Sequence, residues 1–210
     1  MTPLLITQLL ALLGLLFAIG AFARRWRWTA GRPFGVDRSP AKGSPRRGVL
    51  YAFTLGMAPW AKESTRRHMV AYLRGMAFHV GIFSGLAALL VSPWWTGLPQ
   101  PLLWLMAAFT GFGALCGALG ALARWLEHNL RALSTPDDYA SVVLVTIFLA
   151  ATSLALLNPA GLPAMYLASA VLLVYAPLGK IRHCIYFFLS RLFFGLFVGR
   201  RSIMHAEVTE

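Results

Sequence analysis

The stretch Pro177-Leu-Gly-Lys-Ile-Arg-His-Cys-Ile-Tyr186 closes the last long apolar segment of the chain. It brings His183 to the point where apolar sequence meets the basic residues Lys180 and Arg182. An ionisable side chain at the edge of an apolar helix is costly unless it has a partner or a function. His183 is therefore a candidate functional residue, and a partner for it is expected elsewhere in the chain.

The composition is that of a membrane protein. Of the 210 residues, 58% are hydrophobic and 12% are charged, whereas soluble domains carry about 25% charged residues. An excess of 19 Lys and Arg over 7 Asp and Glu would suggest nucleic-acid binding in a soluble protein. Here the basic residues lie between apolar segments, so we interpret them through the positive-inside rule and expect no nucleic-acid partner.

Five apolar segments approach the length of about 20 residues that a helix needs to cross a bilayer. We therefore expect an all-α membrane protein with a single domain over residues 1–210. The expected spans cover approximately residues 3–22, 72–94, 101–122, 139–157 and 162–184. The expected connections are an inner loop over 24–71, a helical extension over 185–201 that is too short to span alone, and a polar tail over 202–210.

The basic residues predict the orientation of these spans. With the N-terminus outside, the loops over 92–100 and 158–163 face outward and contain no charged residue. All 19 Lys and Arg then lie on the inner side, and the reversed topology would place all of them outside. We expect the N-terminus outside, the C-terminus inside, and the extension over 185–201 on the inner face.

Two of the five histidines fall within or at the edge of the expected spans. His79 lies about 10 Å inside the inner end of its span, and His183 lies at the inner end of a span that runs the opposite way. Two antiparallel helices with imidazoles at similar depth can hold a haem iron from both sides. Gly75, one turn before His79, would let a flat macrocycle approach the helix. The alternative is that each histidine is a polar residue that forms hydrogen bonds within the bundle.

Other polar residues near this depth are candidates for secondary roles. Lys180 and Arg182 flank His183 and could pair with haem propionates. His68 lies three helical turns before His79 and would share its face, so it is either a propionate or quinone neighbour or a solvated boundary residue. We interpret His128 as an inner-surface residue and His205 as part of the tail. The cysteines, Cys116 and Cys184, have no CxxC partner and cannot alone hold zinc or an iron–sulfur cluster.

Two short motifs resemble a known family. Ala77-Phe-His-Val-Gly-Ile82, with the small-residue-rich helix that follows, resembles the second span of the respiratory nitrate reductase gamma subunit. The segment 177–183 resembles the last span of that family, where a proline and a basic residue precede a ligand histidine. The chain is also similar in kind to the membrane cytochromes of heterodisulfide-reductase-like and sulfite-reduction complexes. The resemblance implies a multi-pass protein of the bacterial cytoplasmic membrane.

The chain departs from this family at two positions. The gamma subunit holds two haems, and the second ligand pair would fall at Leu89 and Met165 in this sequence. Leucine cannot ligate iron, and Met165 alone does not replace the pair. The resemblance therefore implies one haem b, between His79 and His183, and no outer haem.

The first function that we expect is a mono-haem cytochrome b subunit that is itself not catalytic. It would transfer electrons between menaquinone or ubiquinone and a cytoplasmic-side iron–sulfur or catalytic subunit. The alternative, of a different class, is a haem-free anchor or assembly subunit of a redox complex. A small transporter is disfavoured because the expected spans contain no acidic residue.

Overall fold

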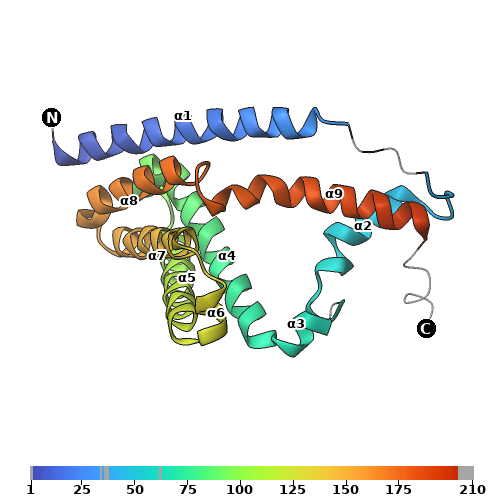
Figure 1. Ribbon diagram of the computed structural model, residues 1–210. Helices are drawn as coiled ribbons and strands as arrows, with labels where there is room; N and C mark the ends of the chain where they lie inside the picture. The colour runs from blue at the N-terminus through green and yellow to red at the C-terminus, as the bar shows by residue number, and fades with distance from the viewer. Residues whose placement is uncertain (1, 34, 36–37, 62, 203–210) are drawn as a thin grey trace. The chain divides into compact units, whose positions relative to one another are not determined.

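The computed structural model describes residues 2–33, 35, 38–61 and 63–202. Within these ranges the chain is helical and contains no strand (Figure 1). The helices are α1 (Pro3–Ala30), α2 (Pro45–Phe53), η1 (Leu55–Met57), η2 (Pro59–Ala61), α3 (Glu63–Arg67), α4 (Met69–Val91), η3 (Ser92–Gly97), α5 (Gln100–Leu126), α6 (His128–Ala132), α7 (Pro136–Leu157), η4 (Pro159–Gly161), α8 (Leu162–Tyr175), η5 (Lys180–Arg182) and α9 (His183–Arg201).

Five helical segments are long and apolar enough to cross a membrane, as the sequence predicts. They are Pro3–Ala30, Met69–Gly97, Gln100–Leu126, Pro136–Leu157 and Lys180–Arg201. The fifth of these segments contains η5 and α9, whereas the span predicted over 162–184 begins with α8, which has only 14 residues. At 1.5 Å per residue α8 is about 21 Å long, against about 30 Å for the hydrocarbon core of a bilayer.

The predicted span over 162–184 is wrong as a continuous helix. The α-helix ends at Tyr175, and the next α-helix begins at His183. Pro177 has no N–H to donate to the preceding turn, which interrupts a helical ladder. The backbone N–H groups of Leu178 and Gly179 both donate to the Tyr175 carbonyl and form a turn. The predicted extension over 185–201 is consequently a 19-residue helix that starts at His183.

The chain packs as two compact units. The first contains residues 2–21 and 73–181, and the second contains 22–72 and 182–202 of the described chain. The boundaries fall inside α1 and α4, so both helices contribute to both units.

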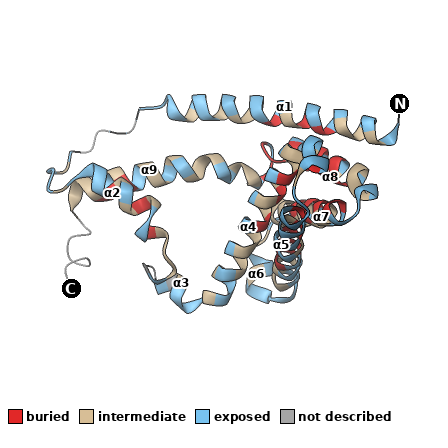
Figure 2. Cartoon of the chain, turned by 180° about the vertical axis from the view of Figure 1, so that it is seen from behind, coloured by how far each residue is buried: buried red, intermediate tan, exposed pale blue. Residues whose placement is uncertain are grey.

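In the first unit, α5 and α7 lie against each other, and α8 returns along α7. Glycines allow two further helices to approach closely. A Cβ at Gly81 of α4 would lie 2.8 Å from the Cα of Gly113 of α5, and a Cβ at Gly14 of α1 would lie 3.1 Å from the Ala170 carbonyl oxygen of α8. Small residues at such crossings are typical of helices that pack within membranes. Figure 2 shows the buried residues concentrated on α5, α7 and α8, while α1 is largely exposed.

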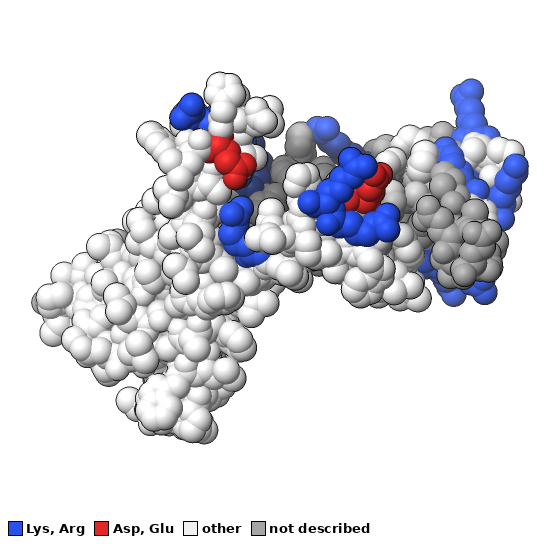
Figure 3. Space-filling view, turned by 90° about the horizontal axis from the view of Figure 1, so that it is seen from below, with Lys and Arg blue, Asp and Glu red and all other residues white. Residues whose placement is uncertain are grey.

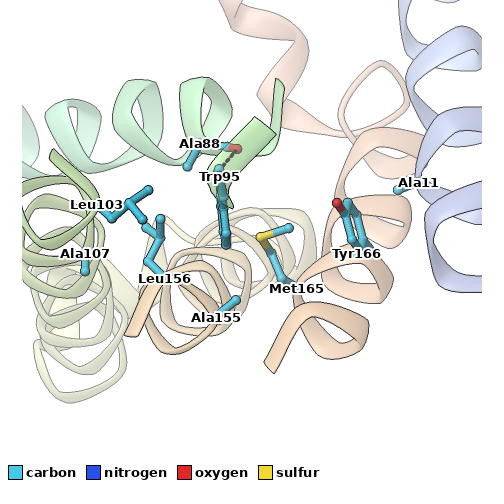
Figure 4. Close-up of a cluster of buried hydrophobic side chains, with 9 residues drawn as sticks. All are labelled: Ala11, Ala88, Trp95, Leu103, Ala107, Ala155, Leu156, Met165 and Tyr166. Atoms are coloured by element: carbon cyan, nitrogen blue, oxygen red, sulfur yellow. Dashed lines mark hydrogen bonds between the residues drawn. The ribbon is translucent and has the colours of Figure 1, made fainter. Parts of the chain in front are cut away.

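One core cluster of this unit joins α1, α4, α5, α7 and α8 around Trp95 (Figure 4). The indole N–H of Trp95 donates to the Ala88 carbonyl at 3.0 Å, so this large side chain is buried without losing its hydrogen bond. The Tyr166 hydroxyl donates to Ser92 at 2.8 Å. These bonds tie the end of α4 and η3 to α8.

In the second unit, α2 packs along α9. Gly48 on α2 lies in close backbone contact with Gly195 and Gly199 on α9. Figure 3, which draws both units, shows Lys and Arg side chains on some parts of the surface and other parts without a charged side chain. An uncharged surface of that kind suits contact with hydrocarbon.

Candidate functional site

The imidazole of His79 is the best-defined candidate ligand. His79 lies on α4, and its side chain is exposed. Its Nδ1 lies 2.7 Å from the backbone carbonyl oxygen of Gly75. A carbonyl oxygen only accepts, so Nδ1 carries a proton, and in a neutral imidazole Nε2 then holds the lone pair. A metal-bound histidine commonly has this tautomer, with the second ring nitrogen held by a backbone carbonyl.

The surroundings of His79 leave room on one side of the helix. A Cβ at Gly75 would meet no atom within 4 Å. Gly81 and Gly85 behave differently, because Gly81 packs on Gly113 and Gly85 faces the ring of Phe148. The side of α4 that carries His79 and Gly75 is therefore open, whereas the side with Gly81 and Gly85 faces the core of the first unit.

His183 is the first residue of α9 and is exposed. The sequence placed it at the inner end of a span, whereas the structure places it directly after the break over 176–182. His79 belongs to the first unit and His183 to the second. The pairing of these two histidines on one iron remains a prediction from the sequence.

Lys180 has a structural partner that the sequence did not suggest. Its ammonium group forms a salt bridge of 2.6 Å with the Asp138 carboxylate. The same carboxylate accepts from the backbone N–H and the hydroxyl of Thr135, each at 2.8 Å, and so caps α7. Lys180 thus holds the turn before α9 to the first residues of α7.

The other two predicted neighbours lie at the ends of helices. Arg182 is the N-cap residue of α9. His68 is exposed and lies between α3 and α4, and its carbonyl accepts from the Tyr72 N–H at 3.0 Å. This bond continues the hydrogen-bond ladder of α4 back to His68, and the shared face of His68 and His79 stays a prediction from the sequence.

A polar network that the sequence analysis missed secures the C-terminal end of α8. The Tyr175 hydroxyl lies 3.0 Å from the Ser141 hydroxyl and also donates to the Asp137 side chain. Gly179 packs against this tyrosine, since a Cβ there would lie 2.3 Å from its ring Cζ. The only sequence signal was a glycine two residues after Pro177. The network fixes the chain where it leaves α8.

Leu89 and Met165, the two positions that depart from the family pattern, are packing residues. Met165 is completely buried in the cluster around Trp95 (Figure 4). Leu89 is partly buried and packs against the same cluster. Side chains from α4 and α8 therefore fill the region where the second ligand pair would fall.

Among the described residues, no three His, Cys, Asp or Glu side chains are grouped so that they could hold a metal ion. A haem iron needs only two axial ligands from the protein, so this finding bears on other metal centres. Comparison of the chain with protein families, with curated proteins and with solved structures gave no match.

Proposed function

We propose that this chain is the mono-haem cytochrome b subunit of a respiratory redox complex in the bacterial cytoplasmic membrane. It would transfer electrons between a quinone, menaquinone or ubiquinone, and an iron–sulfur or catalytic subunit on the cytoplasmic side. The observation that carries the proposal is the His79 imidazole, with Nδ1 bonded to the Gly75 carbonyl. Its Nε2 lone pair is available on the open side of a long apolar helix.

Each candidate residue has a proposed role. His79 and His183 are the proposed axial ligands, and Gly75 leaves space for the macrocycle. A six-coordinate haem supplies one-electron transfer without binding a substrate at the iron. Arg182 and His68 are the proposed neighbours of the propionates or of a quinone head group. Lys180 is a weaker candidate than the sequence implied, because Asp138 already neutralises it.

The direct test is the reduced-minus-oxidised absorption spectrum of the purified chain, together with its haem content. We expect a cytochrome b spectrum and one haem per chain. His79→Ala and His183→Ala should each abolish the spectrum. His128→Ala, which removes an exposed imidazole from α6, is the matched control and should leave it unchanged. A spectrum that survives either ligand substitution would defeat the assignment, and a chain that never binds haem would support the anchor alternative.

A second test uses the open space over Gly75. A leucine there would occupy the place of the macrocycle without meeting protein atoms near its Cβ. Gly75→Leu should therefore lower the haem content while the helical circular-dichroism signal stays unchanged. Val80→Leu, at a position that is 46% exposed on the same helix, is the control. Equal haem content in both variants would contradict the proposed position of the haem.

A further inference from the structure

The α2–α9 pair is joined by direct backbone contact. A Cβ at Gly48 would lie 2.1 Å from the Gly195 carbonyl oxygen and 2.5 Å from the Cα of Gly199. No side chain separates the two helices there, so α2 is fixed along the last turns of α9. Figure 1 shows α2 beside the C-terminal part of α9.

The C-terminal end of α9 is also tied to the segment before α2. The backbone N–H groups of Lys42 and Gly43 donate to the Arg200 carbonyl at 2.9 and 3.0 Å. The Arg200 guanidinium in turn donates to the Ser39 carbonyl at 3.2 and 3.3 Å. Residues 39–43 and the end of α9 therefore lie on the same side of any membrane that the chain crosses.

The two ends of α9 lie on one membrane side by the positive-inside rule. Residues 39–43 follow the basic end of α1, which carries Arg24, Arg25 and Arg27. The start of α9 follows Lys180, which is bonded to Asp138 at the first turn of α7. The segment before α7 is also basic, with Arg124 and Arg131. Both ends then belong to the cytosolic side, so α9 does not cross the membrane although it is long enough.

The composition of the pair suits the surface of an anionic membrane. Four phenylalanines of α9 are between 40% and 53% exposed: Phe188, Phe193, Phe194 and Phe197. The described residues 38–61 and 182–202 contain eight basic residues and no acidic one; the basic ones are Arg38, Lys42, Arg46, Arg47, Arg182, Arg191, Arg200 and Arg201. Exposed aromatic rings on a basic helix are typical of helices that lie in the interface of membranes with anionic lipids.

We propose that α2 and α9 form an interfacial element that lies along the cytosolic leaflet and binds anionic phospholipid headgroups. Phe193, Phe194 and Phe197, on the side of α9 opposite Gly195 and Gly199, enter the boundary between headgroups and acyl chains. Arg46 and Arg47, on the exposed side of α2, contact the lipid phosphates. The proposal requires a membrane but does not depend on a haem, so its failure would leave the cytochrome assignment open to its own test.

The first arm of the experiment tests the sidedness of α9 in the full chain, in sealed and oriented vesicles. Cys184 is an exposed native thiol at the start of α9, whereas Cys116 is buried. Ser202→Cys in a Cys184→Ser background places a thiol just after its end. A membrane-impermeant maleimide should label both positions from the same side, and a Thr2→Cys control from the opposite side. Labelling of 184 and 202 from opposite sides would show that α9 crosses the membrane and would overturn the proposal.

The second arm tests the lipid. Ser190, an exposed residue of α9, is replaced by cysteine in the Cys184→Ser background and labelled with a fluorophore. The labelled chain is then reconstituted in phosphatidylcholine. Headgroup-proximal nitroxides on phosphatidylglycerol should quench it several-fold more than the same label on phosphatidylcholine. Each basic residue near an anionic surface raises the affinity for that surface by a factor of about 5. Replacing both Arg46 and Arg47 by glutamine should therefore remove most of the preference for phosphatidylglycerol.

Arg131→Gln, which removes one cation from α6 of the first unit, is the matched control and should keep the preference. Equal quenching by the two lipids in the unmodified chain would overturn the proposal and point to a protein partner for this surface. Quenching that is strongest from nitroxides at the bilayer centre would overturn it as well, because it would place α9 across the hydrocarbon.

Discussion

The pairing of α2 with α9 predicts a large effect of adding one methyl group at Gly48. An alanine Cβ there would lie 2.5 Å from the Gly199 Cα, about 1 Å inside the separation of 3.5–4.0 Å that is optimal for two carbon atoms. The obstacle is backbone, so no side-chain rotation relieves it and the two helices must separate.

The magnitude follows from two opposing effects. Overpacking costs about 1–3 kcal/mol, and contact with rigid backbone places this case near the upper end. Replacing a helical glycine by alanine recovers about 0.5–1 kcal/mol. The net loss for Gly48→Ala is thus about 2 kcal/mol, which corresponds to a roughly 30-fold larger population of the separated pair.

Trypsin reports this population, because Arg46 and Arg47 lie in α2 beside the contact. When opening and closing are fast relative to cleavage, the cleavage rate follows the open population. We expect cleavage after these residues to be roughly 30-fold faster in Gly48→Ala. Gly20→Ala, where a Cβ would meet no atom within 4 Å, is the control and should match the unmodified chain. Equal rates in Gly48→Ala and in the control would refute the close backbone contact.

Three further predictions concern the first unit, each measured by thermal unfolding in detergent. Met165→Ala should destabilise the chain by about 2–5 kcal/mol because the side chain is completely buried. Leu167→Ala, at a position that is 49% exposed, is the control and should destabilise it much less. Similar losses of stability in the two variants would show that Met165 is not a core residue. Asp138→Ala removes a helix cap and a salt bridge and should lower the stability by about 1–2 kcal/mol. Lys180→Ala removes the partly exposed ion pair but not the cap, and should lower it by about 1 kcal/mol or less. A larger loss for Lys180→Ala than for Asp138→Ala would contradict the capping role. Trp95→Phe loses the buried indole hydrogen bond and should cost about 1 kcal/mol or more, and an unchanged midpoint would argue against that bond.

The helices could be predicted because apolar length is a local property of the sequence. Five segments of spanning length were expected, and the structure has five such helices. The helix over 162–184 was expected to be continuous because the apolar character continues through Ala176, Pro177 and Leu178, but it ends at Tyr175. Hydropathy does not register that Pro177 lacks an N–H and that Gly179 permits contact with the Tyr175 ring. The break is a matter of hydrogen bonding and shape, and the Pro-x-Gly spacing was its only local signal.

The contacts of the candidate site were less accessible from sequence. The bond from His79 to the Gly75 carbonyl follows from the helix itself, since the two residues are four apart. The partner of Lys180 is 42 residues away, at Asp138, and no local pattern connects them. The spacing of Gly195 and Gly199 is a known signature of close helix packing, but α2 was not expected as a helix and so no partner was apparent.

The sparse packing of α1 has a consequence for the order of assembly. Gly14 of α1 meets Ala170 of α8, and these residues are far apart in the chain. At synthesis rates of about 5–20 residues per second, α1 must wait roughly 8–30 seconds for that partner to emerge. During this time α1 must persist as a lone helix in lipid, which its uncharged stretch over 3–23 allows. The residues of α1 that are buried in the folded chain, Ala11, Gly14 and Ala18, stay uncovered by α8 until then.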